Sequence, residues 1–197
     1  MRVVTLDKEQ FDSACVQLGE KMVNDSEPVA IIGVLTGGSI VAKNIYASLQ
    51  GDLPELKYFD ISASRTSSIA KRKINVGRLF RMLPGYVLNL LRVFEHYHLR
   101  FIMRFRAKFE RHVQLNTLLR DYLEDLSDGC VYIVDDAIDS GSTIEGVVTM
   151  LKDINSKLNY KIAALVITQN ESLVSPDVSL YQNVLIRFPW SSDYKND

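Results

Sequence analysis

Two apolar runs, each ended by a turn of small residues, constrain the fold of this chain more than any other feature. Val29–Leu35 runs into Thr36–Ser39 (TGGS), and Cys130–Val134 runs into Asp135–Thr143 (DDAIDSGST). A helical spacing of apolar residues follows each turn. Continuous apolar runs of this length are typical of strands buried on both faces, and strand, turn, helix is the repeating unit of a parallel sheet with crossover helices.

The remaining elements extend this pattern. We expect strands at Val29–Leu35, Leu56–Ile61, Cys130–Val134, Lys161–Thr168 and Val184–Phe188, and helices over Phe11–Met22, Ile40–Gln50 and Thr143–Leu158. The sequence therefore predicts an α/β fold with an open, mostly parallel sheet flanked by helices. In such sheets, ligands bind beyond the carboxyl ends of the strands, near the point where the strand order reverses. We expect both turns to lie at that edge.

Length and cysteine content place the chain in a broad class. A chain of 197 residues favours one domain over residues 1–197. Cys15 and Cys130 are far apart and belong to no paired motif, which indicates a reducing compartment. The N-terminal residues lack the apolar core of a signal peptide, and the longest uncharged run, Pro28–Ala42, is too short to span a membrane. We therefore expect a cytoplasmic protein.

Residues 66–127 interrupt the strand and helix pattern, because they contain no convincing strand. From Val87 to Val113, apolar residues recur every three or four positions. This spacing predicts a helical hairpin or helix pair inserted into the domain. The aromatic stripe of this segment is expected to form a core or a contact between copies of a homo-oligomer. It consists of Phe94, Phe101, Phe105 and Phe109.

The same segment is strongly basic. Residues 65–112 carry twelve Lys or Arg and two Glu, a net charge of +10, although the whole chain has a net charge of −1. Such an excess usually marks a surface that meets something anionic, which includes the acidic remainder of the protein.

The residues after the second apolar run are suited to an anion and a sugar. Gly141 permits backbone angles that other residues avoid, so successive N–H groups of Asp139–Thr143 can point into one concavity. The hydroxyl groups in this loop and the N-terminus of the following helix add to a phosphate cradle. Asp135 and Asp136, just upstream, can accept hydrogen bonds from sugar hydroxyls or hold a divalent cation. The combination predicts a phosphorylated sugar with Mg²⁺.

Three stretches of this chain resemble type I phosphoribosyltransferases, and most of all the purine-type members of that family. Residues 131–143 (VYIVDDAIDSGST) resemble the signature for phosphoribosyl pyrophosphate at every position. Residues 33–42 (GVLTGGSIVA) resemble the pyrophosphate loop, and residues 187–194 (RFPWSSDY) resemble the C-terminal hood strand. The resemblance implies the fold of that family with a small hood, predicted over residues 170–197. It does not extend to the basic insertion at 66–127.

The resemblance implies roles for the residues of the signature. Asp135 and Asp136 would meet the ribose hydroxyls, directly or through Mg²⁺, and Asp139 would act as general base or acid near N7 of a purine. The amides and hydroxyls of the loop would hold the 5-phosphate. That loop comprises Asp139, Ser140, Gly141, Ser142 and Thr143.

Other site residues follow from the remaining matches. Thr36, Gly37 and Gly38 would bind the departing pyrophosphate, and Arg65, in the expected mobile loop, could also meet it. Trp190 would stack on the base. Members that bind 6-oxopurines usually carry a lysine after the fourth strand; this chain has VITQN there, with Gln169 as the nearest polar candidate. The implied reaction transfers a phosphoribosyl group from phosphoribosyl pyrophosphate to a nitrogen base, with a purine as first candidate.

Alternatives from other functional classes stay open at this point. A protein of this fold can use the ribose-phosphate site to sense a nucleotide or phosphoribosyl pyrophosphate and act as a regulator whose basic insertion binds nucleic acid. The basic, aromatic helix can also suit a membrane surface or a partner subunit. The presence of both phosphate loops favours the enzyme, since a regulator needs no pyrophosphate site.

Overall fold

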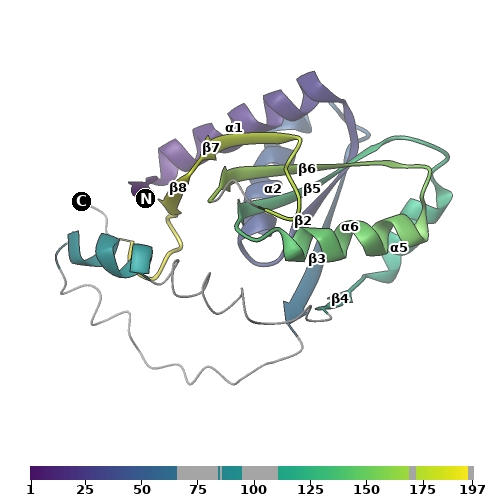
Figure 1. Ribbon diagram of the computed structural model, residues 1–197. Helices are drawn as coiled ribbons and strands as arrows, with labels where there is room; N and C mark the ends of the chain where they lie inside the picture. Colours follow the sequence, from purple (N-terminus) through teal and green to yellow (C-terminus); the bar gives the residue numbers. More distant parts are fainter. Residues whose placement is uncertain (66–83, 85, 95–110, 169–171, 195–197) are drawn as a thin grey trace.

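The computed structural model describes residues 1–65, 84, 86–94, 111–168 and 172–194. Six strands form its main sheet, in the order β4-β3-β2-β5-β6-β7 (Figure 1). They are β2 (Pro28–Val34), β3 (Lys57–Arg65), β4 (Arg111–Gln114), β5 (Cys130–Ile138), β6 (Asn159–Ile167) and β7 (Val178–Gln182). Neighbouring strands run parallel except β3 and β4, which are antiparallel.

The strand order reverses between β2 and β5. From β2 the chain continues to β3 on one side, whereas from β5 it continues to β6 and β7 on the other. The two central strands are in register, with Gly33 opposite Val134 near their carboxyl ends. Ligands of open parallel sheets bind at such a reversal, so this pair of strand ends is where a site is expected.

Helices cover both faces of the sheet (Figure 1). Helices α1 (Lys8–Asp25) and α2 (Gly37–Leu49) pack on one face, and α5 (Thr117–Asp125) and α6 (Ser142–Ile154) on the other. Successive residues of β5 alternate between the two cores: Val131 and Ile133 pack with α5 and α6, whereas Tyr132 and Val134 pack with α1 and α2. Because both faces are covered, β5 has no charged residue from Cys130 to Val134, as expected for a buried parallel sheet, and its two aspartates come only near its carboxyl end.

A second, two-stranded sheet forms a small separate unit of the fold. Strand β1 (Arg2–Thr5) runs parallel to β8 (Val184–Arg187). Beyond β8, Phe188 packs edge to face against Phe11 of α1, with ring centroids 6.4 Å apart. This contact joins the segment directly after β8 to the first helix.

The structure confirms the predicted fold class and corrects it in detail. Neither β1 nor β7 was predicted, and β7 joins the main sheet although it lies within the predicted hood range of 170–197. The expectation that 66–127 holds no strand is wrong at Arg111–Gln114, where Val113 lies in β4 instead of a helical stripe. This short segment has no apolar run, and its strand conformation comes from pairing with β3.

Part of the predicted insertion is described. Residues 86–94 form a helix, as the apolar spacing predicts. Phe94, the residue of the predicted aromatic stripe that lies in this helix, is 67% exposed and does not enter the core, and the nearby Leu90 is 68% exposed. A contact between copies through the stripe stays a prediction. Phe101, Phe105 and Phe109 lie outside the described residues, and the extent of the insertion stays a prediction. Every helix in the described part of the chain is too short or too polar to span a bilayer.

The hydrogen bonds that join the C-terminal end of α1 to β5 lead to a first prediction. The hydroxyl of buried Tyr132 donates to Asp25 Oδ2 at 2.5 Å and lies 3.1 Å from the Met22 carbonyl oxygen, while Lys161 pairs with Asp25 at 2.6 Å. Tyr132→Phe should lower the free energy of unfolding by about 1–2 kcal/mol in urea, because α1 loses a buried hydrogen bond to the sheet. The control is Tyr86→Phe, at a residue 75% exposed, which should change stability little. Equal effects of the two variants would contradict the assignment.

Candidate functional site

The TGGS turn after β2 meets the acidic part of the neighbouring strand β5, although the two are far apart in the sequence. A Cβ atom on Gly38 would lie 2.5 Å from the Val134 carbonyl oxygen and 2.8 Å from the Asp135 Cα atom. A Cβ atom on Gly37 would overlap the Asp136 carboxyl group. These approaches are closer than any side chain allows, so the Gly-Gly pair is needed for the TGGS turn to lie against the acidic pair.

The turn after β2 passes directly into α2. A cis peptide bond joins Leu35 to Thr36, and α2 begins at Gly37 with Thr36 as its N-cap residue. The Thr36 side chain is exposed. The turn thus presents the backbone amides at the positive end of a helix, beside the carboxylates of β5. Amides in this position can hold an anion.

The loop after β5 leads into the N-terminus of α6. Gly141 has φ +75° and is the N-cap residue of α6, and it has no side chain that could cover the first amides of the helix. The loop is fixed from outside, because the Leu173 amide donates to the Ser140 carbonyl oxygen at 2.9 Å. Within it, the hydroxyls of Ser140 and Ser142 are 3.1 Å apart. The arrangement suits a phosphate group bound by amides and hydroxyls.

Thr168 orients Asp139, a contact that the sequence analysis missed. The Thr168 hydroxyl, in a residue only 6% exposed, donates to Asp139 Oδ1 at 2.9 Å and lies 3.3 Å from the Ile138 carbonyl oxygen. Thr168 follows β6, the strand next to β5. In the sequence, the signal that could have indicated this contact was the position of Thr168 at the end of a predicted strand.

The acidic pair is electrostatically constrained. Burial raises the pKa of the Asp136 carboxyl group above its usual range, and the Asp136 amide donates to Asp135 Oδ1 at 3.0 Å. Among the described residues, no cluster of three or more His, Cys, Asp or Glu is placed to hold a metal ion. Two adjacent carboxylates fit Mg²⁺ when the remaining ligands are water and substrate oxygens, which is the usual manner in which proteins bind that ion.

A second polar group supports α2 from β3. Tyr58 donates to Asp60 through a short hydrogen bond, and its hydroxyl is 3.1 Å from the Ser39 hydroxyl in the first turn of α2. Lys43 lies 3.5 Å from Asp60 Oδ2. Burial raises the pKa of Tyr58, so the phenol keeps its proton. Tyr58 and Asp60 are two apart and share one face of the strand, which was the only sequence signal for them.

The structure gives less detail for the other predicted site residues, Arg65, Gln169 and Trp190. Arg65 is the last residue of β3, and Gln169 lies outside the described residues. Trp190 is 37% exposed and stacks on Phe188, with ring centroids 4.7 Å apart and planes 3° apart. It also meets Phe11 edge to face at 5.0 Å. The tryptophan is therefore part of an aromatic cluster and still has exposed surface. All functional roles of these residues stay predictions.

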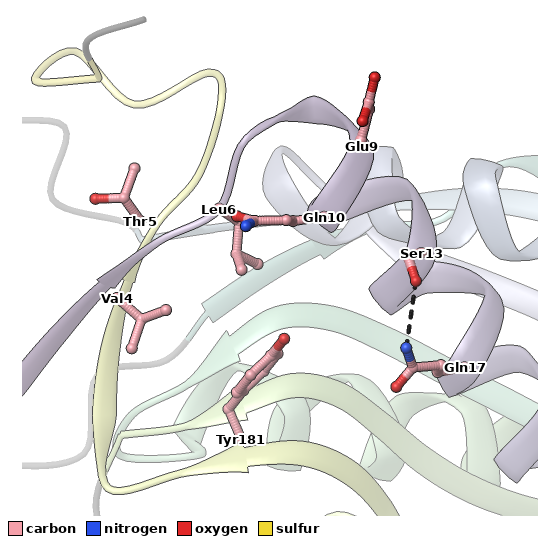
Figure 2. A pocket seen from close by; sticks show the side chains of 8 residues that line it. All are labelled: Val4, Thr5, Leu6, Glu9, Gln10, Ser13, Gln17 and Tyr181. Atoms are coloured by element: carbon pink, nitrogen blue, oxygen red, sulfur yellow. Dashed lines mark hydrogen bonds between the residues drawn. The ribbon is translucent and has the colours of Figure 1, made fainter. Parts of the chain in front are cut away.

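A shallow cavity of about 500 Å³ lies elsewhere, between β1, α1 and β7 (Figure 2). None of the predicted site residues lines it. Its lining residues are Val4, Thr5, Leu6, Glu9, Gln10, Ser13, Gln17 and Tyr181. Figure 2 shows the Gln17 side-chain amide donating to the Ser13 hydroxyl across part of the rim. Two of the polar lining residues of this cavity, Ser13 and Gln17, thus pair with each other on α1.

The contact between the TGGS turn and β5 predicts the effect of Gly38→Ala. The added methyl group would press on the backbone of β5, so we expect a loss of about 1–3 kcal/mol in the free energy of unfolding. Gly146→Ala is the matched control, because a Cβ atom at Gly146 in α6 would meet nothing within 4 Å. That variant should be stabilised by about 0.5–1 kcal/mol, since alanine favours the helix. Similar values for both variants would exclude the close approach.

The raised pKa of Asp136 predicts a pH-dependent cost. The folded state holds the Asp136 proton to a higher pH than the unfolded state, so this contribution to stability is present below the unfolded pKa and is lost as the pH rises through the folded pKa. Asp136→Asn should therefore raise the free energy of unfolding by on the order of 1 kcal/mol at about pH 8, and the gain should vanish below about pH 4. Urea titrations across this range measure it. A gain independent of pH would contradict the assignment.

The chain is similar to known proteins in both sequence and structure. The chain matches the family described as Phosphoribosyl transferase domain over residues 6–196. No curated protein sequence matches it significantly. A purine phosphoribosyltransferase from Pyrococcus horikoshii is similar in structure, with 25% sequence identity, a TM-score of 0.61 and coverage of 96% of this chain and 95% of that chain.

Two other solved structures share the fold at lower identity. A Helicobacter pylori xanthine-guanine-hypoxanthine phosphoribosyltransferase has 17% identity and a TM-score of 0.62, covering 96% of this chain and 94% of that chain. A Neisseria gonorrhoeae protein with bound ppGpp has 16% identity and a TM-score of 0.60, covering 96% of this chain and 89% of that chain. With the family match spanning nearly the whole chain and the sheet built as that family requires, the chain belongs to the type I phosphoribosyltransferases.

Proposed function

We propose that this protein transfers a phosphoribosyl group from phosphoribosyl pyrophosphate to a ring nitrogen of a base, with a purine as first candidate. One observation carries the proposal: where the strand order reverses, the TGGS turn lies against Asp135 and Asp136 of β5, a few residues before the Asp139–Thr143 loop. Phosphoribosyl pyrophosphate has phosphate at both ends of a sugar, so two anion-binding loops separated by carboxylates match its charge pattern.

Each loop has a defined place in this scheme. The amides and hydroxyls of Ser140–Thr143 would bind the 5-phosphate at the start of α6, and the amides of Thr36–Gly38 would bind the pyrophosphate at the start of α2. The carboxylates of Asp135 and Asp136, between the two, would accept hydrogen bonds from the ribose hydroxyls. Charge develops on the departing pyrophosphate, and preorganised amides stabilise it without reorganising.

Mg²⁺ is the cofactor that the acidic pair fits. Asp135 and Asp136 would hold the ion together with oxygens of the substrate, and the ion would neutralise charge on the departing pyrophosphate. Because burial raises the pKa of Asp136, the carboxyl group must lose its proton before it binds a cation. Metal affinity should therefore increase with pH through the range in which Asp136 ionises.

Asp139 is the proposed general base or acid for the ring nitrogen of the base. The hydroxyl of Thr168 donates to Oδ1 of this carboxyl group and so limits its rotation. Trp190 is the proposed stacking partner of the base, because part of its surface is exposed while Phe188 supports one ring face. The similarity to the Pyrococcus horikoshii enzyme supports a purine as the acceptor.

A panel of bases tests the proposal. Pyrophosphate release from phosphoribosyl pyrophosphate should occur with Mg²⁺ and at least one purine, and be slower without the metal. Asp139→Asn should lower kcat by about a hundredfold or more, as expected for loss of general acid–base catalysis. Binding of phosphoribosyl pyrophosphate, measured by calorimetry, should change little in that variant. The matched control is Asp153→Asn, an acid of α6 outside the proposed site.

Tight binding of phosphoribosyl pyrophosphate with no turnover on any base would contradict the proposal. The regulatory alternative would then be favoured. The calorimetric series includes ppGpp, since the Neisseria gonorrhoeae protein of similar fold has it bound. Retention on heparin that is lost at moderate salt would indicate that the basic segment binds nucleic acid.

A further inference from the structure

The 86–94 helix of the basic segment docks on the turn that carries Trp190. Figure 1 shows this helix, in teal, beside the yellow C-terminal part of the chain. Leu88 is buried, at 3% exposure, and faces inward. Leu90 and Phe94, by contrast, are exposed. The helix therefore uses its Leu88 side for an internal contact.

The turn itself is closed by Ser191. The Ser191 amide donates to the Phe188 carbonyl oxygen at 2.9 Å, and the Phe188 amide donates to the Ser191 hydroxyl at 3.1 Å. Pro189 occupies the second position of this turn, where its fixed φ is favourable, and Trp190 the third. The orientation of the Trp190 ring therefore depends on the geometry of Ser191 and on the stack with Phe188.

Arg92 reaches this turn from the helix. Its Nη2 atom donates to the Ser191 hydroxyl at 3.2 Å and lies 3.7 Å from Asp193 Oδ1. The Arg92 and Asp193 side chains are only 25% and 12% exposed, so solvent screens this contact weakly. The Ser191 hydroxyl already accepts the hydrogen bond that closes the turn. The additional hydrogen bond from the charged Arg92 side chain therefore holds the turn in one conformation.

A second connection passes through Arg187, the last residue of β8. Its side chain is buried and donates to Asp193 Oδ2 at 2.9 Å, to the Thr5 hydroxyl at 3.1 Å and to Asn89 Oδ1 at 2.8 Å. Asp193 thus lies between two arginines, one from β8 and one from the helix. The three elements β1, β8 and the 86–94 helix meet on this one guanidinium.

We propose that the 86–94 helix is a positioning element for base binding, in which Asn89 and Arg92 hold the Phe188–Ser191 turn so that Trp190 presents its exposed surface to the base. The inference rests on the proposed function only in naming the base as the ligand of Trp190. It assigns part of the basic segment to a contact with Asp193 and Ser191 of its own chain. These two residues act through the turn and are positioning residues.

The chain contains one tryptophan, so its fluorescence reports on the turn directly. Arg92→Gln and Asn89→Ala should shift the emission to longer wavelength and increase quenching by acrylamide. Arg92→Lys, which keeps a cation near Asp193, should give an intermediate effect. Arg120→Gln is the control, because Arg120 is an exposed arginine of α5 paired with Glu124. It should leave the emission unchanged. Circular dichroism identifies any variant that does not fold.

Kinetics supply the second readout. Arg92→Gln should raise KM for the base by roughly tenfold, the effect expected from losing one charged hydrogen bond, and leave KM for phosphoribosyl pyrophosphate unchanged. Native emission and quenching in folded Arg92→Gln and Asn89→Ala would overturn the inference, as would equal changes in both KM values or the same spectral change in Arg120→Gln. If Arg92→Gln does not fold, Asn89→Ala and Arg92→Lys decide by the same criteria. Absence of turnover with every base would count against the proposed function, while the fluorescence would still decide this inference.

Discussion

The close approach of the TGGS turn to the acidic residues of β5 is the contact on which the candidate site depends. Gly37 and Gly38 lie against the backbone and carboxyl groups of Asp135 and Asp136, at a distance that no side chain would permit. This contact places a helix N-terminus beside a pair of acids, and the second helix start follows a few residues later. Without it, the TGGS turn and the loop before α6 would be separate, and the proposed site for a substrate charged at both ends would not form.

The site and the fold make opposing demands on the same residues. Burial raises the pKa of Asp136, so the carboxylate that suits a sugar or a metal ion is unfavourable in the protein alone. Substrate and Mg²⁺ would relieve this cost on binding. The surrounding groups Tyr58, Ser39 and Thr168 stabilise the neighbouring structure, since their hydrogen bonds keep α2 and Asp139 in place. Such local cost is common at functional sites, where stability and activity compete.

The basic segment illustrates how a charge pattern is ambiguous until its partners are known. A local net charge of +10 is compatible with nucleic acid, a membrane or the acidic part of the same protein. In the described helix, Arg92 meets Asp193, and Asn89 meets Arg187. At least this part of the segment therefore contacts the C-terminal residues of its own chain. The exposed side chain of Phe94 shows that this residue of the predicted aromatic stripe does not belong to the core.

Local patterns predicted most of the sheet and the positions of the two glycine turns, because continuous apolar runs, glycine turns and helical spacing are properties of neighbouring residues. That the two turns bind anions stays a proposal. The runs at Val29–Leu35 and Cys130–Val134 became β2 and β5, and the glycine turns lie at their ends. The short strands β1, β4 and β7 were not predicted. Each is defined by a distant partner, so its own few residues carry little signal.

Contacts between distant residues were decided by tertiary packing alone. Thr168 meets Asp139 because β6 lies beside β5, and Arg92 meets Ser191 because a helix from the middle of the chain docks on its end. Hydrogen bonds depend on distance and direction in space, which spacing along a chain does not contain. The local sequence specified which groups could bind phosphate and sugar, and the packed sheet decided which of them stand together and how they are held.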